Sequence, residues 1–210
     1  MTAAPRKPER VTSTQTLTFS PATLDRFDDV AALLAPKRAD APACWCLTYR
    51  LTSSEFNRLR GDERPARLRS FFGGDLAPGV IAYDGEEPVG WCAFGPRTQM
   101  GRLQRSKTIP QVDEQPVVSI VCFVVRASHR RKGVARGMLQ AATDYLRSNG
   151  VETVEAYPID NNGRKINGAF AYVGTVPLFE SCGFEKTIIT SSTTSGMARW
   201  VMRKQLSRDR

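Results

Sequence analysis

The stretch from Val117 to Gly150 constrains the fold of this chain more than any other. It opens with an apolar run that ends at Val125, is rich in β-branched residues and is too short to cross a membrane. Such a run is typical of a strand buried on both faces in the middle of a sheet. From Ala135 onward the apolar residues recur at helical spacing until Gly150 ends the pattern. The stretch therefore predicts a buried strand, a short turn and an amphipathic helix.

The turn between this strand and this helix concentrates positive charge. A helix N-terminus is already the positive end of the helix dipole, so cations there are unfavourable unless a negative group lies among them. The free N–H groups of a helix start can bind a phosphate, and Gly133 and Ala135 leave room for its approach. A solvated basic turn is the alternative, but the small residues favour an anion site. The cations concerned are Arg130, Arg131, Lys132 and Arg136.

The same turn resembles a family signature. The run Arg130-Arg131-Lys132-Gly133-Val134-Ala135 resembles the Arg/Gln-x-x-Gly-x-Gly/Ala signature of the GCN5-related N-acetyltransferases (GNAT family). Its surroundings agree with the family pattern, because a second apolar run at 151–157 follows the helix. PLFESCGFE at 177–185 then looks like the family's short helix and Gly-Phe pair. The resemblance covers about residues 78–204.

The resemblance implies a fold in the α/β class. We expect one acyl-CoA N-acyltransferase domain over 15–210, with a mixed central sheet flanked by helices on both faces, behind a flexible tail at 1–14. A chain of 210 residues, 41% of them hydrophobic, suits one domain with a sizeable core. No run has the length of a membrane span, and the N-terminus lacks a signal peptide's hydrophobic region. Five cysteines without framework spacing indicate reduced thiols, so the expected location is cytoplasmic.

Caps, turns and periodicity predict the remaining elements. Ser20 and Pro21 are interpreted as the cap of a helix that ends near residue 34, and 43–51 is interpreted as a strand. Cys44 and Cys46 on that strand are interpreted as buried thiols rather than as a metal or redox pair, and no metal site is expected. The other expected elements are strands at 15–19 and 151–157, one or two helices within 53–72, a hairpin joining 80–83 to 89–94, a short helix at 176–181, and strands at 184–190 and 200–204.

The resemblance also implies the donor site. In the family the amides of the turn hold the pyrophosphate of acetyl-CoA, and the pantetheine arm enters the gap between the two central strands like a short added strand. Acetyl-CoA is therefore the expected acyl donor. The residues implied to bind it are Phe123, Val124, Val125, Arg130, Arg131, Lys132, Gly133, Val134, Ala135, Arg136 and Phe179.

The catalytic groups depart from the family pattern. Many relatives carry a glutamate on the central strand as general base, but the corresponding position here is near Cys122. Glu155 is the first substitute, because it faces the cleft with Tyr157 if the alternating apolar residues face the helix. A solvated strand glutamate is the alternative. The tyrosine that often serves as general acid is replaced by Phe179, so Tyr157, Tyr172 or solvent would protonate the thiolate.

The predicted function is acyl-CoA-dependent N-acyl transfer, with acetyl moved to a primary amine by direct attack on the thioester. The net charge of +9 favours anionic partners, and the cations of the 95–116 segment either recruit an anionic acceptor, bind coenzyme A phosphates or are simply solvated. One alternative is a non-catalytic acyl-CoA-binding protein, because the usual acid and tyrosine are missing. Another is an RNA-associated acetyltransferase that acts on aminoacyl-tRNA. Analogy with relatives also suggests that the protein forms a homodimer.

Overall fold

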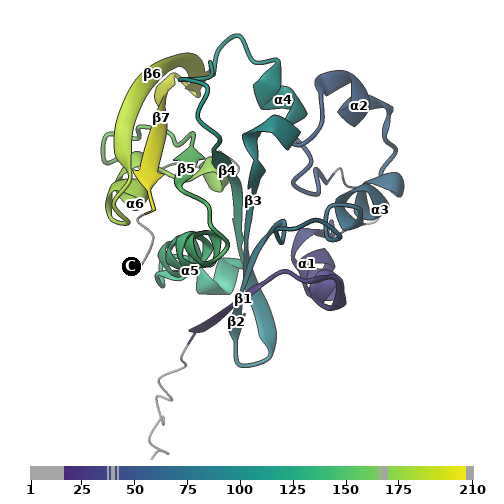
Figure 1. Ribbon diagram of the computed structural model, residues 1–210. Coiled ribbons are helices and arrows are strands. Elements are labelled where there is room, and N and C mark those ends of the chain that lie inside the picture. Colours follow the sequence, from purple (N-terminus) through teal and green to yellow (C-terminus); the bar gives the residue numbers. More distant parts are fainter. Residues whose placement is uncertain are drawn as a thin grey trace, which may run out of the picture.

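The computed structural model describes residues 17–36, 38, 41, 43–164, 166 and 170–206, so the predicted tail at 1–14 lies outside the described residues. The described chain forms a seven-stranded sheet in the order β1-β2-β3-β4-β5-β7-β6 (Figure 1). Only β4 and β5 are parallel neighbours, and every other adjacent pair is antiparallel. The predicted mixed sheet with a central parallel pair is confirmed.

The strands lie close to their predicted positions. The apolar run that opens the 117–150 stretch is the central strand. The hairpin before it turns at Gly85 and Glu86, with Gly85 at a positive φ of 61°, and Asp84 still pairs with Glu87 at the ends of the strands. The bounds are β1 (Leu17–Pro21), β2 (Gly79–Asp84), β3 (Glu87–Pro96), β4 (Val118–Val125), β5 (Thr153–Ala156), β6 (Glu185–Thr194) and β7 (Met197–Gln205).

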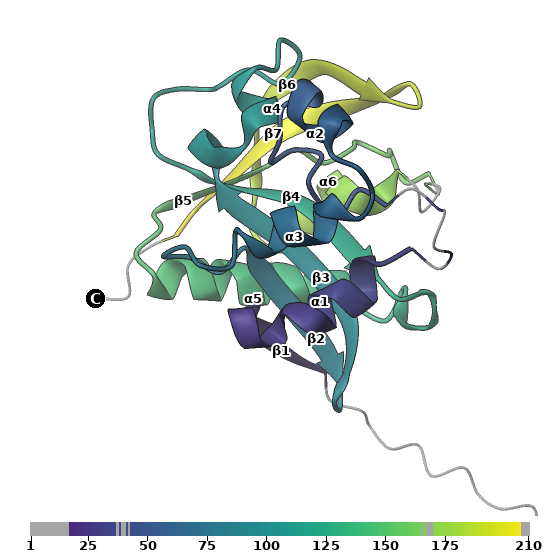
Figure 2. The ribbon, with the colours of Figure 1, turned by 90° about the vertical axis from the view of Figure 1, so that its right-hand side faces the viewer.

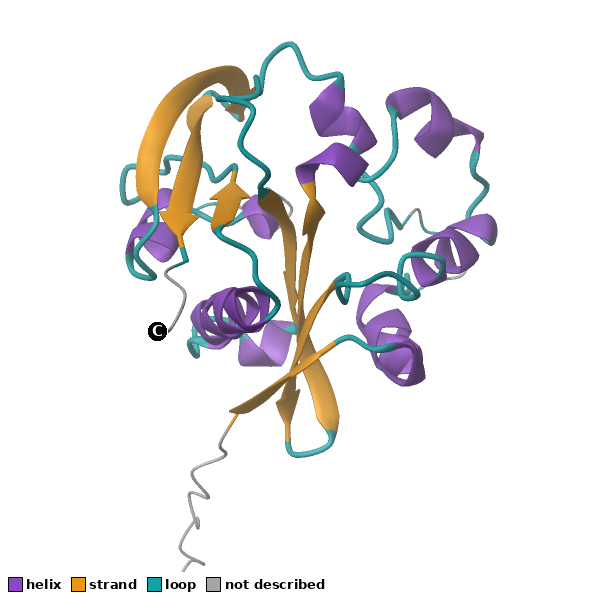
Figure 3. Cartoon of the chain, viewed as in Figure 1, coloured by secondary structure: helices purple, strands orange, loops and turns teal. Residues whose placement is uncertain are grey.

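Helices cover both faces of this sheet, with α5 on one face and α1 and α3 on the other (Figures 2 and 3). The predicted break between 53 and 72 produces two separate helices, α2 and α3. The bounds are α1 (Phe27–Leu34), α2 (Ser53–Arg58), α3 (Glu63–Arg69), α4 (Gly101–Gln104), α5 (Val134–Ser148) and α6 (Val176–Glu180), with single 3-10 turns η1 (Leu24–Arg26), η2 (Arg97–Gln99), η3 (Ala127–His129) and η4 (Ala171–Val173).

Strand alternation divides the core into two halves. Along β2, Val80 and Ala82 pack in the half beneath α5, whereas Ile81 and Tyr83 pack in the opposite half. The helix α5 approaches the sheet closely because Gly137 lies against β1, where a Cβ would come within 2.2 Å of the Phe19 ring. No helix of the described residues is both long and apolar enough to cross a membrane.

Two predicted features near the N-terminus are wrong. Ser20 and Pro21 do not cap a helix but end β1, where they pair with β2, and a proline is tolerated at the end of an edge strand. The 43–51 segment is a series of turns rather than a strand, because Trp45 and Cys46 adopt left-handed backbone angles (φ 48° and 52°). Cys44 is consequently exposed while Cys46 is buried.

The central pair of strands separates along its length. β4 pairs with β5 only from Val118 to Ile120. At that point β4 carries an extra residue, Val121, opposite the step from Ala93 to Phe94 in β3. A bulge of this kind bends a strand and increases its twist, which turns the end of β4 away from β5. Phe123–Val125 therefore pair with β3 on one edge, and no described strand pairs with them on the other.

Candidate active site

A cavity of about 880 Å³ lies where the unpaired edge of β4 meets the N-terminus of α5. We call it the α5 cavity. It brings together most of the residues that the sequence predicted for donor binding, although they come from a strand, a turn and a helix. Its lining comprises Phe123, Val124, Val125, His129, Arg130, Arg131, Gly133, Val134, Ala135, Arg136, Asn161, Arg164, Ile166, Ala171, Tyr172, Gly174 and Leu178.

Two residues of the predicted donor set do not line the α5 cavity. Lys132 is exposed but lies outside its lining. Phe179 is fully buried, with its ring centroid 6.0 Å from that of Phe123 and 5.0 Å from that of Phe184. Its side chain therefore packs in the core behind Phe123 and does not reach the cavity.

The backbone of the turn is shaped for an anion. Arg131 (φ 60°) and Gly133 (φ 81°) are both left-handed, and Gly133 is the N-cap of α5. No side-chain acceptor caps the helix, and its first turn contains no acidic residue. A Cβ placed on Gly133 would meet no described atom within 4 Å, so the space beside it is open. The helix start thus offers uncapped N–H groups next to open space, which is the arrangement that binds phosphate.

Neighbouring polar contacts hold this turn in place. The Arg130 Nε donates to the Val125 carbonyl at 3.2 Å. His129 Nε2 lies 3.0 Å from the Asp84 carboxylate, which ties the turn to the end of β2. These contacts fix the turn and the Arg130 side chain relative to the sheet.

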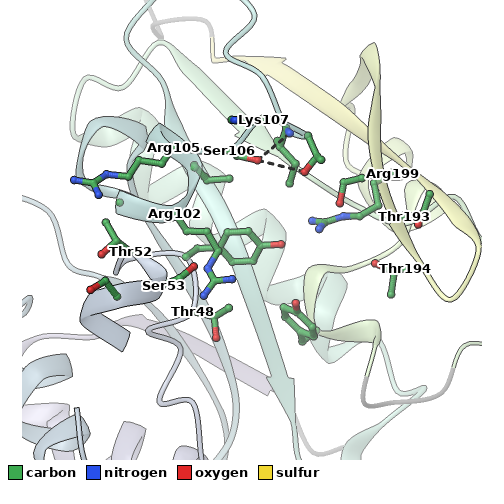
Figure 4. A pocket seen from close by; sticks show the side chains of 18 residues that line it. Thr48, Thr52, Ser53, Arg102, Arg105, Ser106, Lys107, Thr193, Thr194 and Arg199 are labelled. Carbon is green, nitrogen blue, oxygen red and sulfur yellow. Dashed lines mark hydrogen bonds between the residues drawn. The ribbon is translucent and has the colours of Figure 1, made fainter. Parts of the chain in front are cut away.

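A second cavity of about 590 Å³ lies between the segment that carries α4 and the hairpin of β6 and β7 (Figure 4). We call it the α4 cavity. Hydroxyl groups and cations dominate its lining, and none of its lining residues is an Asp or Glu. They are Thr48, Tyr49, Thr52, Ser53, Ser54, Gly101, Arg102, Leu103, Arg105, Ser106, Lys107, Thr108, Ile109, Tyr172, Ser192, Thr193, Thr194 and Arg199.

Tyr172 is the residue that lines both cavities. Its side chain is half-buried, and burial raises the pKa of its phenol above the usual range, with nearby Tyr49 adding to the increase. The phenol therefore stays protonated well beyond neutral pH and is available as a proton donor at the junction of the cavities. Of the predicted catalytic residues, Tyr172 is the one that the structure places there.

Glu155 and Tyr157 lie elsewhere, and their predicted orientation toward the cleft is wrong. They do face away from α5, as the alternation of β5 predicted, but both side chains are buried and line neither cavity. The Tyr157 hydroxyl donates to Glu155 Oε1 at 2.6 Å, and Arg203 Nε donates to Oε2 at 2.8 Å. Arg97 Nε lies 3.5 Å from Oε1, the oxygen that also accepts from Tyr157. A buried carboxylate needs such partners, and here the two arginines come from η2, directly after β3, and from β7.

This buried network anchors the segment that forms one wall of the α4 cavity. Arg203 also pairs with Asp113 at 2.6 Å, and Arg97 donates to the Ile109 carbonyl at 3.2 Å. The segment between β3 and β4 is thereby attached to β5 and β7 near its two ends. We conclude that this buried network holds one wall of the α4 cavity in place, although none of its side chains lines the cavity.

Sequence reasoning missed Arg199 and the hydroxyl residues of β6. The only signal for Arg199 was a single arginine within the apolar run of the last strand, MARWVM. Of the two thiols predicted to be buried, Cys46 is in the core with its sulfur 3.0 Å from that of Cys122, whereas Cys44 is exposed and its predicted burial is wrong. Among the described residues no group of three or more His, Cys, Asp or Glu side chains is arranged to hold a metal.

The separated central strands, the uncapped helix start and the cationic turn form a cavity that suits an extended, anionic ligand. The model of the acetyltransferase (GNAT) family matches residues 45–184, two thirds of the sequence. The chain belongs to this family. It is accordingly an acyl-CoA-dependent acyltransferase, and acetyl-CoA is the acyl donor of its family.

Solved structures agree with this fold. An N-acetyltransferase from Staphylococcus aureus Mu50 matches with a TM-score of 0.54 at 14% identity, over 91% of this chain and 99% of that one. A protein of Salmonella typhimurium, solved with its cofactor acetyl-CoA, matches with a TM-score of 0.52 at 18% identity, over 92% and 95%. The ribosomal-protein-S18-alanine N-acetyltransferase of Escherichia coli matches with a TM-score of 0.50 at 15% identity, over 91% and 95%. Comparison with curated protein sequences found no match.

Proposed function

We propose that this protein is an N-acetyltransferase, which moves the acetyl group of acetyl-CoA to a primary amine. One observation carries the proposal: the unpaired edge of β4 at Phe123–Val125 runs into the uncapped N-terminus of α5 within one cavity. A ligand with amide groups at one end and a diphosphate at the other fits that succession of backbone groups.

Donor binding would depend on two kinds of group, backbone groups and positively charged side chains. The N–H groups at the start of α5 and the open space at Gly133 suit the diphosphate. The exposed cations Arg130, Arg131 and Arg136 add electrostatic attraction. The unpaired backbone edge at Phe123–Val125 would hydrogen-bond an extended, amide-containing arm, as an added strand does. The residues present thus fit the diphosphate and the amide-containing arm of acetyl-CoA.

The chemistry requires one bond to form and one to break. The amine nitrogen bonds to the acetyl carbonyl carbon, and the carbon–sulfur bond breaks. One amine proton is lost and the departing thiolate gains one. Tyr172 is placed at the junction of the cavities with a protonated phenol, so we assign to it the protonation of the thiolate. Backbone N–H groups on the unpaired edge of β4 would stabilise the developing oxyanion.

The general base is assigned to solvent. No carboxylate belongs to the described lining of either cavity, and Glu155 is enclosed by its own partners. The amine would then enter as the free base, so the rate would rise with pH as the deprotonated fraction of the amine rises.

The test is release of free thiol from acetyl-CoA with a panel of primary amines, with the acetylated amine identified by mass spectrometry. Amine-dependent thiol release is expected, and a rate equal to that of acetyl-CoA without amine would contradict the proposal.

The same lack of a carboxylate favours one other candidate, a protein that holds acyl-CoA without catalysis. Calorimetric binding of coenzyme A combined with no amine-dependent turnover would establish that function instead. Steady turnover would exclude it.

A further inference from the structure

The α4 cavity is cationic without internal compensation. Its lining contains Arg102, Arg105, Lys107 and Arg199, and within the described part of the chain no carboxylate lies within 4.0 Å of any of these cations. Glu55 is the acid that Arg105 influences, but its Oε2 accepts from the Thr52 backbone N–H at 2.8 Å and from the Thr52 hydroxyl at 2.7 Å. That carboxylate caps α2 and leaves the cavity positive.

Arg199 is a buried, fixed cation. Its side chain is 5% exposed, and its Nε and Nη2 both donate to the Tyr157 carbonyl, at 3.1 and 2.7 Å. The guanidinium carbon also lies 5.9 Å from the centroid of the Tyr49 ring. A carbonyl oxygen and a ring face orient the guanidinium but do not neutralise it. Removing a cation from water without a counter-ion is costly, so the buried guanidinium favours an anion in the cavity.

Arg102 approaches the cavity from the opposite side (Figure 4). It belongs to α4, and its backbone N–H donates to the Tyr49 carbonyl at 3.2 Å, which fixes the helix against the 48–51 turns. Its Nε is buried and has no hydrogen-bond partner. The half-buried side chain of Arg102 nevertheless adds a second positive charge to the lining, opposite Arg199.

The remaining lining adds neutral donors. Hydroxyls of Thr48 and Ser53 lie near Arg102, and those of Thr193 and Thr194 lie on the side of Arg199 (Figure 4). Hydroxyl groups complete the hydrogen bonding of carboxylate or phosphate oxygens without adding opposing charge. A volume of about 590 Å³ is within the range of small-molecule sites.

From this arrangement we infer that the α4 cavity binds the acceptor, and that the acceptor is a small primary amine that also carries an anionic group, a carboxylate or a phosphate. Arg102 and Arg199 hold the anion, and the amine points past Tyr172 toward the α5 cavity. This inference rests on the proposed N-acetyl transfer for the role of the ligand, but the anion site itself stands on the positive charges of the lining and the lack of a carboxylate beside them.

The test compares amines that differ in the anionic group. Two pairs serve: ethanolamine phosphate with ethanolamine, and β-alanine with β-alaninamide. We expect the wild-type kcat/KM to favour at least one anionic member, and which pair shows the larger preference distinguishes phosphate from carboxylate. In Arg102→Gln the preference should fall by about 10- to 100-fold, the range expected for a lost charge-assisted hydrogen bond. The preference is the ratio of the two kcat/KM values within a pair. A change in a variant that affects both amines of the pair equally therefore cancels.

Two control variants separate the cavity from general charge. Arg147→Gln removes the same charge from α5 outside both cavities and should leave the preference unchanged. Arg131→Gln should raise the KM for acetyl-CoA without changing the preference, because Arg131 lines only the α5 cavity. Arg199→Lys keeps a charge but loses the planar fork and should reduce the preference partially.

A binding measurement keeps this inference distinct from the proposed function. Ethanolamine phosphate and β-alanine are titrated calorimetrically into the coenzyme A-loaded protein and into loaded Arg102→Gln. Binding that the substitution weakens, without any turnover, would support the anion site while contradicting acetyl transfer. Turnover of neutral and anionic amines at equal kcat/KM, insensitive to Arg102→Gln, would overturn the anionic acceptor and leave acetyl transfer standing. Neither turnover nor Arg102-dependent binding would overturn both.

Discussion

The two cavities of this protein are both positive, yet they are built in different ways. The α5 cavity takes most of its lining from one continuous stretch, residues 123–136, in which strand, turn and helix start follow each other. The α4 cavity is assembled from separate segments around 48–54, 101–109, 172 and 192–199. The comparison shows that a site made of backbone at an element junction is local in sequence, whereas a site made of side chains depends on packing between distant segments.

The cationic side chains of the two cavities also differ in their exposure to solvent. Arg130, Arg131 and Arg136 of the α5 cavity are exposed, so salt screens them. Arg199 of the α4 cavity is almost fully buried, and its field is screened much less. Exposed cations suit attraction of a multiply charged donor from solution, while a buried guanidinium suits discrimination between similar acceptors.

The largest effect is expected from Glu155→Gln, which tests whether the buried network supports only the α4 cavity. Removing the negative charge leaves Arg97 and Arg203 without their shared buried partner, which should lower the free energy of unfolding by about 3 kcal/mol. For a chain of this size that corresponds to a decrease in Tm of about 6–12 °C. Calorimetry or urea unfolding measures the change.

The affinity of this variant for coenzyme A should be unchanged, because Glu155 contributes nothing to the α5 cavity. Asp144→Asn, which removes an exposed carboxylate paired with Arg147, is the matched control and should barely alter the Tm. If Glu155→Gln kept its Tm but lost kcat by more than about 100-fold, Glu155 would be the general base after all.

The second effect concerns the turn, where Gly133→Val should weaken coenzyme A binding by about 10- to 100-fold. The added side chain occupies the open space beside the helix start, so the diphosphate can no longer approach the N–H groups. Isothermal titration calorimetry measures the affinity.

Gly150→Val is a closely matched control for this substitution. Gly150 has nearly the same backbone angle (φ 76°, against 81° for Gly133) and equally open surroundings, but it lies at the far end of α5. Both variants carry similar backbone strain, so a similar loss of affinity in both would refute the assignment of the diphosphate to Gly133.

A smaller effect is expected at the junction of the cavities, where Tyr172→Phe should lower kcat by about tenfold. Burial raises the pKa of this phenol, so it remains protonated as the pH rises from 7 to 10. The ratio of wild-type to variant kcat should therefore stay constant across that range, even while both rates rise with the free amine. A ratio that falls between pH 8 and 9 would show that the donor titrates there and is not Tyr172.

The smallest effect separates the exposed from the buried cations. The double variant Arg130→Gln/Arg131→Gln should weaken coenzyme A binding about threefold at low salt and by less than about twofold at 0.5 M salt, because exposed charges are screened. The effect of Arg199→Lys on acceptor preference should persist at both salts, because Arg199 is almost fully buried. Equal salt sensitivity of the two would remove the distinction between the cavities.

Much of the fold followed from local patterns. The apolar run of β4, the periodicity of α5 and the Asp-Gly hairpin each have a local physical cause, so they appeared at nearly their predicted positions. The failures came where tertiary contacts overrode local preference. Ser20 and Pro21 have a helix-cap pattern, but pairing with β2 makes them part of a strand. The turns of the 43–51 segment depend on residues with left-handed backbone angles, which no periodicity in the sequence predicts.

The candidate site divides along the same line. The donor turn was predictable because its chemistry is that of consecutive backbone groups and their immediate charges. Glu155 could be assigned correctly to the face of β5 opposite α5, yet its enclosure by Arg97 and Arg203 depends on residues nearly 50 or more positions away. Arg199 was missed because nothing near it in sequence distinguishes a cavity-lining arginine from a solvated one.

The sequence by itself determined the central strand, the turn and the helix that follows it, together with the family to which they belong, because those features depend on residues next to one another. Only the tertiary structure decided that the carboxylate of β5 is a structural anchor and that a second, cationic cavity lies beside Tyr172. The reason is physical: whether a charged side chain is buried, paired or free is set by neighbours that folding brings from far along the chain.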